Sequence, residues 1–129
     1  MTKTKAQQIM AATEARAADD VTAAIQDIAT EFEPYIIKQR RHFHKHPELS
    51  LAEERTTSDI ANQLDAMNIP YERPLKTGLV ATLRGTAPDA YREDGTPRRR
   101  ILLRADIDAL PVTEQTGEEF ASVNEGCMH

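Results

Sequence analysis

Two carboxylates, Asp106 and Asp108, stand at the end of the apolar run "ILLRADI" in the second half of the chain. Side chains two positions apart on a strand project to the same side, so both acids could face one site. Paired acids at the carboxyl end of a strand in an α/β sheet suit a divalent metal or a general base. A second interpretation remains open, in which Asp106 pairs with Arg104 or another arginine and Asp108 starts a turn.

Histidine and cysteine residues form two further groups of possible metal ligands. His42 and His46 are four residues apart, which places them on one helix face in a geometry that can hold a metal, whereas His44 points elsewhere. Helix-end charge and hydrogen bonding provide the simpler interpretation of these histidines. Cys127 and His129 have the chemistry of zinc ligands, but a small residue in a turn is the simpler interpretation of Cys127.

The first of two predicted helices lies near the start of the chain. Apolar residues recur with helical spacing from Val21 to Phe32, after the acidic pair Asp19-Asp20, which can cap a helix. Pro34 predicts a kink or a restart of this helix. Pro47 ends it, because the residue before a proline is pushed out of the α region.

A second helix is predicted over residues 50–68. Ser50 and Glu53 have the spacing of a capping box, in which each side chain satisfies a backbone N–H of the other residue. This role explains Glu53 without catalysis, and Glu54 belongs to the solvated face of the helix. Asn68 is the expected C-cap.

The second half of the chain has the composition of strands. Segments 69–73, 78–85 and 99–107 are rich in branched and aromatic residues and are bounded by Gly and Pro. The last segment is too continuously apolar for a strand with one wet face, so we expect it inside a sheet that is covered on both sides. A polar loop with an Asp94-Gly95 turn signal precedes it. Helices followed by a buried strand predict an α/β sandwich.

The composition is that of a globular protein rather than a disordered one. The 129 residues fit one domain, with 40% hydrophobic and 29% charged residues, and we read residues 1–18 as a flexible leader before a domain at 19–129. A net charge of −5 argues against nucleic acid or an anionic membrane as a partner. A single cysteine and the absence of a long apolar stretch suggest a cytoplasmic protein.

Four ordered blocks of the sequence together resemble one enzyme family. They are "RRHFHKHPELSLAEERTT" (40–57), "TGLVATLRG" (77–85), "ILLRADIDALPVTEQTGEEFAS" (101–122) and "GCMH" (126–129). They resemble the start of the aminoacylase-like metallopeptidases, in the amidohydrolase branch that includes hippurate hydrolase and auxin-conjugate hydrolases. Four blocks in order are a more specific signal than any single short motif.

The resemblance implies hydrolysis of N-acyl amino acids or related amides. In this family two divalent ions, zinc or manganese, polarise the carbonyl and activate a water, and a glutamate is the base. The catalytic domain is a three-layer α/β/α sandwich with a mixed sheet, and a lid domain often dimerises, so the full-length enzyme is expected to be a homodimer or higher oligomer. This chain would be the N-terminal part of the catalytic domain, with Glu114 in a loop near the cleft.

Only one site residue transfers through the resemblance. Asp106 matches the acid that follows a metal-binding histidine by two positions and orients it, but Arg104 takes the place of that histidine here, as is usual in the amidohydrolase branch. His129 matches the histidine of "MH", which precedes the branch's Cys-Gly-His ligand segment, and Cys127 falls at a variable position. The metal ligands and the catalytic glutamate would lie beyond His129. We therefore predict that this chain alone binds no metal and is inactive.

Two alternatives belong to other functional classes. One is a non-catalytic truncated remnant or interaction module, since unpaired sheet edges invite pairing with other chains. The other is a phosphate or nucleotide enzyme that uses Asp106 and Asp108. The five glycines are scattered rather than gathered in a phosphate-binding loop, which argues against this last reading.

Overall fold

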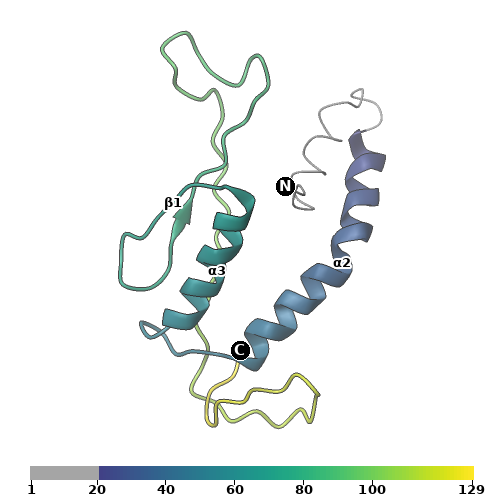
Figure 1. Cartoon of the computed structure of the whole chain (residues 1–129), viewed down its shortest axis with the longest axis vertical. Coiled ribbons are helices and arrows are strands. Elements are labelled where there is room, and N and C mark those ends of the chain that lie inside the picture. The colour runs from purple at the N-terminus through teal and green to yellow at the C-terminus, as the bar shows by residue number, and fades with distance from the viewer. Residues whose placement is uncertain (1–20) are drawn as a thin grey trace.

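The computed structural model describes residues 21–129, and the leader predicted at 1–18 and the Asp19-Asp20 cap lie outside the described residues. The elements in chain order are α2 (Val21–Lys45), α3 (Glu54–Met67), β1 (Tyr71–Glu72) and β2 (Val80–Ala81). Figure 1 shows the two helices closest at their lower ends, with one long loop extending above α3 and another, coloured yellow-green, below the lower end of α2. No described helix is long and apolar enough to cross a membrane.

Helix α2 continues through Pro34 instead of restarting after it. Figure 1 shows that α2 bends partway along its length, which fits the kink expected where proline removes a backbone donor. The last turn carries His42, His44 and Lys45, whose positive charge, when present, favours the carboxyl end of a helix. The helix ends two residues before Pro47, as the sequence predicts.

Helix α3 begins at Glu54, so the predicted start at Ser50 and its capping box are wrong. Glu53 is the N-cap and makes no capping hydrogen bond with its side chain. The carboxylate of Glu48 caps the helix instead, accepting the backbone N–H groups of Arg55 at 3.1 Å and Thr56 at 2.7 Å. Glu48, six residues before the start of α3, thus satisfies two of the free N–H groups of the first turn, which a capping box would otherwise satisfy.

The other end of α3 agrees with the prediction. Asn68 adopts the left-handed conformation, with φ of 56°, that favours Asn or Gly after a helix. Its N–H donates to the carbonyl of Asp65, and the N–H of Ile69 donates to that of Leu64. These bonds satisfy carbonyls that a helix end otherwise leaves free.

The first two predicted strands are present in shortened form as the antiparallel pair β1 and β2. Tyr71 lies opposite Ala81, and Glu72 lies opposite Val80. The N–H of Gly78 donates to the hydroxyl of Thr57, a buried residue of α3, at 2.8 Å. This bond fixes the hairpin to the helix. The turn predicted at Asp94-Gly95 is confirmed, because Gly95 has φ of 79° and Asp94 accepts the N–H of Thr96.

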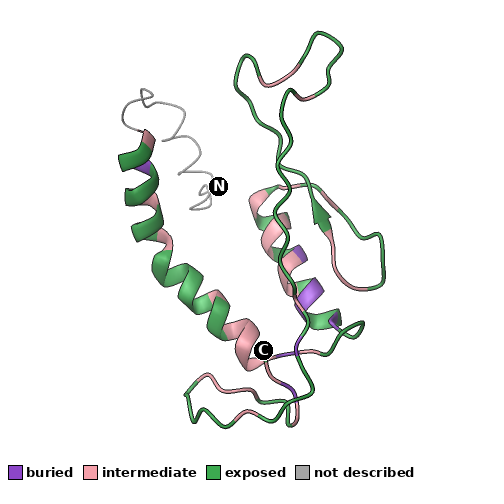
Figure 2. Cartoon of the chain, turned by 180° about the vertical axis from the view of Figure 1, so that it is seen from behind, coloured by how far each residue is buried: buried purple, intermediate pink, exposed green. Residues whose placement is uncertain are grey.

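The third predicted strand does not form, and the prediction that it is buried is wrong. Residues 101–108 are assigned to no strand, and the side chains of Ile101, Leu102 and Leu103 are 88%, 86% and 91% exposed. Figure 2 shows this stretch in green, as an exposed extended segment that runs past α3. A buried strand needs neighbouring strands and covering layers, and residues 21–129 place none against it. The described chain therefore has two helices and a two-stranded sheet, without the expected three-layer arrangement.

Several buried residues gather where the end of α2 and the start of α3 meet the segment 109–129, and we call this region the junction. The N–H of Ala109 donates to the carbonyl of Glu48, and Ala109 is 4% exposed. The N–H of Val123 donates to the carbonyl of Lys45, and the amide of Asn124 donates to that of Pro47. The last residues of the chain are thus packed against the link between the two helices.

Candidate functional site

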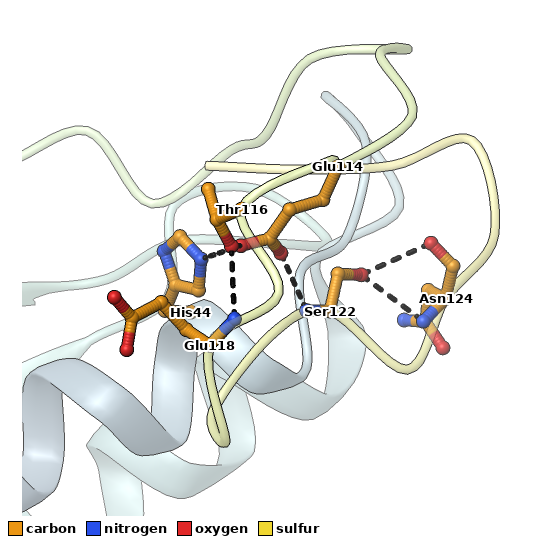
Figure 3. A network of polar contacts seen from close by, with 6 residues as sticks. All are labelled: His44, Glu114, Thr116, Glu118, Ser122 and Asn124. Atoms are coloured by element: carbon orange, nitrogen blue, oxygen red, sulfur yellow. Dashed lines mark hydrogen bonds and ion pairs between the residues drawn. The ribbon is translucent and has the colours of Figure 1, made fainter.

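Glu114 is the centre of the most developed polar network in the described chain. Its side chain is 5% exposed and that of His44 is 14% exposed, and the ring Nε2 of His44 lies 2.9 Å from Glu114 Oε1. The hydroxyl of Thr116 donates to the same oxygen, and the backbone N–H of Ser122 donates to Oε2 at 2.5 Å. Figure 3 shows these groups converging on the carboxylate, with Ser122 bonded onward to Asn124.

These contacts lower the pKa of Glu114. The hydrogen bond from His44 lowers the pKa of Glu114 to about 2, helped by the N–H of Ser122 and the hydroxyl of Thr116. The carboxylate is therefore ionised at neutral pH, with both oxygens already accepting hydrogen bonds. A general base works best with a pKa near the operating pH and needs a free oxygen, so Glu114 is suited to holding structure and not to moving protons.

The end of the chain lies beside this network. Leu110 and Met128 exchange two backbone hydrogen bonds, at 2.9 and 3.0 Å, and so pair the segment after Asp108 with the last residues. Burial lowers the pKa of His129, and the charge of nearby His44 lowers it further, while Asp108 acts in the opposite direction. His44 and Asp108, which come from two other parts of the sequence, thus both lie close enough to His129 to shift its pKa.

Cys127 lies in a turn and is 7% exposed. Its N–H donates to the carbonyl of Asn124, and Gly126 before it has φ of 71°, a conformation that glycine adopts readily. Burial raises the pKa of the Cys127 thiol, and the negative charge of Glu48 raises it further. Metal ligation requires the thiolate, so this environment disfavours a metal-binding role.

Asp106 forms an ion pair with Arg104 at 2.6 Å, with side-chain exposures of 61% and 79%. This contact matches the second interpretation of the Asp-x-Asp pattern, in which the acid pairs with an arginine. An exposed pair of this kind contributes little to stability. The orienting role of Asp106 toward a metal ligand stays a prediction.

His42 and His44 of α2, and His46 just beyond its end, lie in different surroundings. His42 Nε2 lies 2.8 Å from Asp59 of α3, His44 binds Glu114, and the Nδ1 of His46 is buried without a hydrogen-bond partner. Burial lowers the pKa of His46, and the charge of Arg55 adds to this effect. The rings of His42 and His46 lie 5.2 Å apart. The arrangement joins the two helices, and the hydrogen bonds account for His42 and His44.

The possible metal ligands of the described residues do not gather in one place. Residues 21–129 contain no group of three or more His, Cys, Asp or Glu side chains that could hold a metal ion. Cys127 is buried with a raised thiol pKa, and His42 and His44 each bind a carboxylate.

Two polar contacts of the junction cannot be predicted from the sequence pattern. Glu114 and His44 are separated by 70 positions, and no local pattern links them. The capping role of Glu48 depends on the turn at 49–52, in which Leu51 has φ of 66°. An acidic residue shortly before a helix can indicate a cap, but the Ser50–Glu53 spacing is the more familiar capping pattern and favours a different cap for α3.

No family model matches the chain. Among curated proteins, an uncharacterized hydrolase of Staphylococcus epidermidis is 43% identical over 95 residues, which cover 74% of this chain and 22% of that protein. An uncharacterized hydrolase of Staphylococcus saprophyticus is 44% identical over 100 residues, covering 78% of this chain and 23% of that protein. The chain thus spans less than a quarter of the length of these relatives.

Two solved structures are also similar. The YXEP protein of Bacillus subtilis, a dinuclear metal binding peptidase from the M20 family, is 41% identical with a TM-score of 0.65, over 78% of this chain and 26% of that one. A proposed aminohydrolase from methicillin-resistant Staphylococcus aureus is 36% identical with a TM-score of 0.66, over 80% of this chain and 25% of that one. The expected similarity to hydrolases and metal-binding peptidases is confirmed at this level. The amidohydrolase branch, the substrate and the metal stay predictions.

Proposed function

We propose that this chain is the N-terminal part of the catalytic domain of a metal-dependent amidohydrolase. The observation that carries the proposal is its 41% identity, with a TM-score of 0.65, to a dinuclear metal binding peptidase of the M20 family. The order of the four sequence blocks agrees with it. Residues 101–103 are apolar but exposed in this chain. A continuously apolar segment is typical of a strand inside a sheet that is covered on both sides, so these residues fit a larger sheet in a longer protein.

The proposed substrates are N-acyl amino acids or related small amides, in a cytoplasmic enzyme that needs neither nucleic acid nor a membrane. Two divalent ions, zinc or manganese, would supply carbonyl polarisation and water activation in the longer protein. Asp106 is proposed to orient a ligand there, and the longer protein is proposed to be a homodimer or higher oligomer. The residues of this chain serve as scaffold, and the chain alone is proposed to be inactive.

The test compares the purified 129-residue chain with the product of the reading frame extended beyond His129. Both are assayed against a panel of N-acyl amino acids, with and without a chelator, and their bound metal is measured by elemental analysis. We expect hydrolysis only from the longer product, with loss in chelator and recovery on adding zinc or manganese. Hydrolysis by the 129-residue chain that a chelator abolishes contradicts the assignment of the ligands to other residues.

A second candidate function is a non-catalytic interaction module. The observation that favours it is the exposed apolar run Ile101, Leu102 and Leu103, which is a ready surface for pairing with another chain. Sedimentation of the 129-residue chain at several concentrations addresses this candidate. A stable, defined oligomer, together with a reading frame that does not continue into ligand residues, supports the module over the enzyme.

A further inference from the structure

A single carboxylate closes the loop formed by residues 114–122. Glu114 accepts the hydroxyl of Thr116 near the start of the loop and the backbone N–H of Ser122 at its end. The N–H of Glu118 approaches the hydroxyl of Thr116 at 3.4 Å, so the middle of the loop also turns toward the carboxylate (Figure 3). A buried carboxylate is unfavourable unless donors surround it, and here three donors do so. The loop is therefore ordered by one charged group.

The same carboxylate attaches the loop to α2. His44 bonds to Glu114 at 2.9 Å from the last turn of the helix, and its ring lies 5.6 Å from that of Phe120, edge to face. The guanidinium of Arg41, one turn earlier, lies 4.8 Å from the centre of the Phe120 ring. Two residues of α2 thus hold two residues of the loop, so the loop has a fixed position relative to the helix.

The two flanks of this loop lead directly into the paired end of the chain. Leu110 precedes Glu114 by four positions, and Met128 follows the return of the chain through Ser122 and Asn124. Leu110 and Met128 are joined by two backbone hydrogen bonds. Because Glu114 binds the N–H of Ser122, it joins the outgoing segment to the returning one between Leu110 and Met128.

We propose that His44 and Glu114 are a positioning pair that fixes the path of the chain through Met128 and His129. In doing so, they place the residues that follow, where the ligands of the metal centre are expected. The placement of ligands rests on the proposed function, whereas the ordering of the Leu110–Met128 pair does not. Neither residue touches substrate or metal in this role, and each acts through the backbone that it holds.

The test on the 129-residue chain is residue-resolved amide hydrogen exchange of Glu114→Ala and His44→Ala. We expect exchange at Leu110 and Met128 to become faster by roughly tenfold or more, with α3 unchanged, because each variant removes a hydrogen bond to a charged group. His44→Gln retains a side-chain N–H donor and should recover much of the protection. Glu119→Gln, which removes an exposed carboxylate of the same loop, is the matched control and should change nothing.

The outcomes separate positioning from general stability. Unchanged exchange at Leu110 and Met128 in both alanine variants overturns the proposal. It is also overturned if His44→Gln and Glu114→Gln accelerate exchange throughout α3 as much as at Leu110 and Met128. Where an alanine variant fails to fold, Thr116→Val removes only one donor to Glu114. It should accelerate the same two amides selectively, and no acceleration there also overturns the proposal.

The longer product carries the second arm. Glu114→Ala should lower its zinc affinity and kcat together, with little change in KM, since misplaced ligands weaken the reacting centre more than substrate binding. If the unmutated longer product binds no zinc, the proposed function fails, while the exchange data still decide the positioning role. If it binds zinc and Glu114→Ala leaves the affinity and kcat unchanged, the ligand-placing role is wrong.

Discussion

Glu48 accepts the backbone N–H of Thr56 at 2.7 Å, and its own carbonyl accepts the N–H of Ala109. One residue therefore caps α3 with its side chain and holds the segment 109–129 with its backbone. The junction is organised around such double contacts, since the chain offers few large buried side chains there. Its buried apolar residues, Pro47, Ala109 and Cys127, all have small side chains.

The capping contact predicts that Glu48→Ala destabilises the chain by about 1–2 kcal/mol, the usual loss when a capping side chain is removed. The variant leaves the N–H groups of Arg55 and Thr56 without their acceptor. Urea unfolding followed by circular dichroism measures the difference. Ser50→Ala is the control, and it should change stability by less than about 0.5 kcal/mol. A larger loss of stability in Ser50→Ala than in Glu48→Ala would contradict the capping role of Glu48 and support the capping box.

The charge of Glu114 predicts a specific acid dependence of stability. Its pKa is lowered from 4.5 to about 2 by His44, Ser122 and Thr116, so the folded chain binds this proton less readily than the unfolded chain. The stabilisation is complete above pH 4.5 and is lost as the pH falls toward 2. Urea unfolding at several pH values should show a decline over this range that is shallower in Glu114→Gln. Glu119→Gln should retain the decline of the unmutated chain, and parallel curves for all three proteins would contradict the prediction.

Cys127 is predicted to react slowly with an aromatic disulfide reagent. Burial and the charge of Glu48 raise its thiol pKa, so little thiolate is present at neutral pH. The rate in the folded chain should be lower than in urea by roughly tenfold or more, and Cys127→Ser should give no signal. Adding zinc should leave the rate unchanged. Protection by one equivalent of zinc would show that Cys127 is a ligand after all.

The sequence was sufficient where a signal is local. Asn68 ends α3 because few other residues tolerate the left-handed conformation, and Pro34 and Pro47 act through their own rings, so these positions are readable from a few neighbouring residues. The contact of His44 with Glu114 joins residues 70 positions apart, and only the assembled chain brings them together. The prediction of a buried strand at 101–107 is wrong although its signal is local. The composition of this segment specifies a buried strand, but burial depends on neighbours that residues 21–129 do not provide.

The exposed run at 101–103 yields the last prediction. Replacing Leu103 by Lys should leave the stability of the 129-residue chain within about 0.5 kcal/mol, because the side chain is 91% exposed and has almost no buried area to lose. It should also reduce concentration-dependent association, measured by sedimentation, because a charge on an unpaired apolar segment opposes pairing between chains.

Ala61→Lys in α3 is the contrasting variant. Ala61 is 2% exposed, so a lysine there places a charge in a packed site and should unfold the helix region. In the longer product, Leu103→Lys should be as damaging as Ala61→Lys if the segment becomes a central strand. If instead the longer product tolerates lysine at position 103, the segment stays exposed there too, and the proposal that it belongs to a larger sheet is wrong.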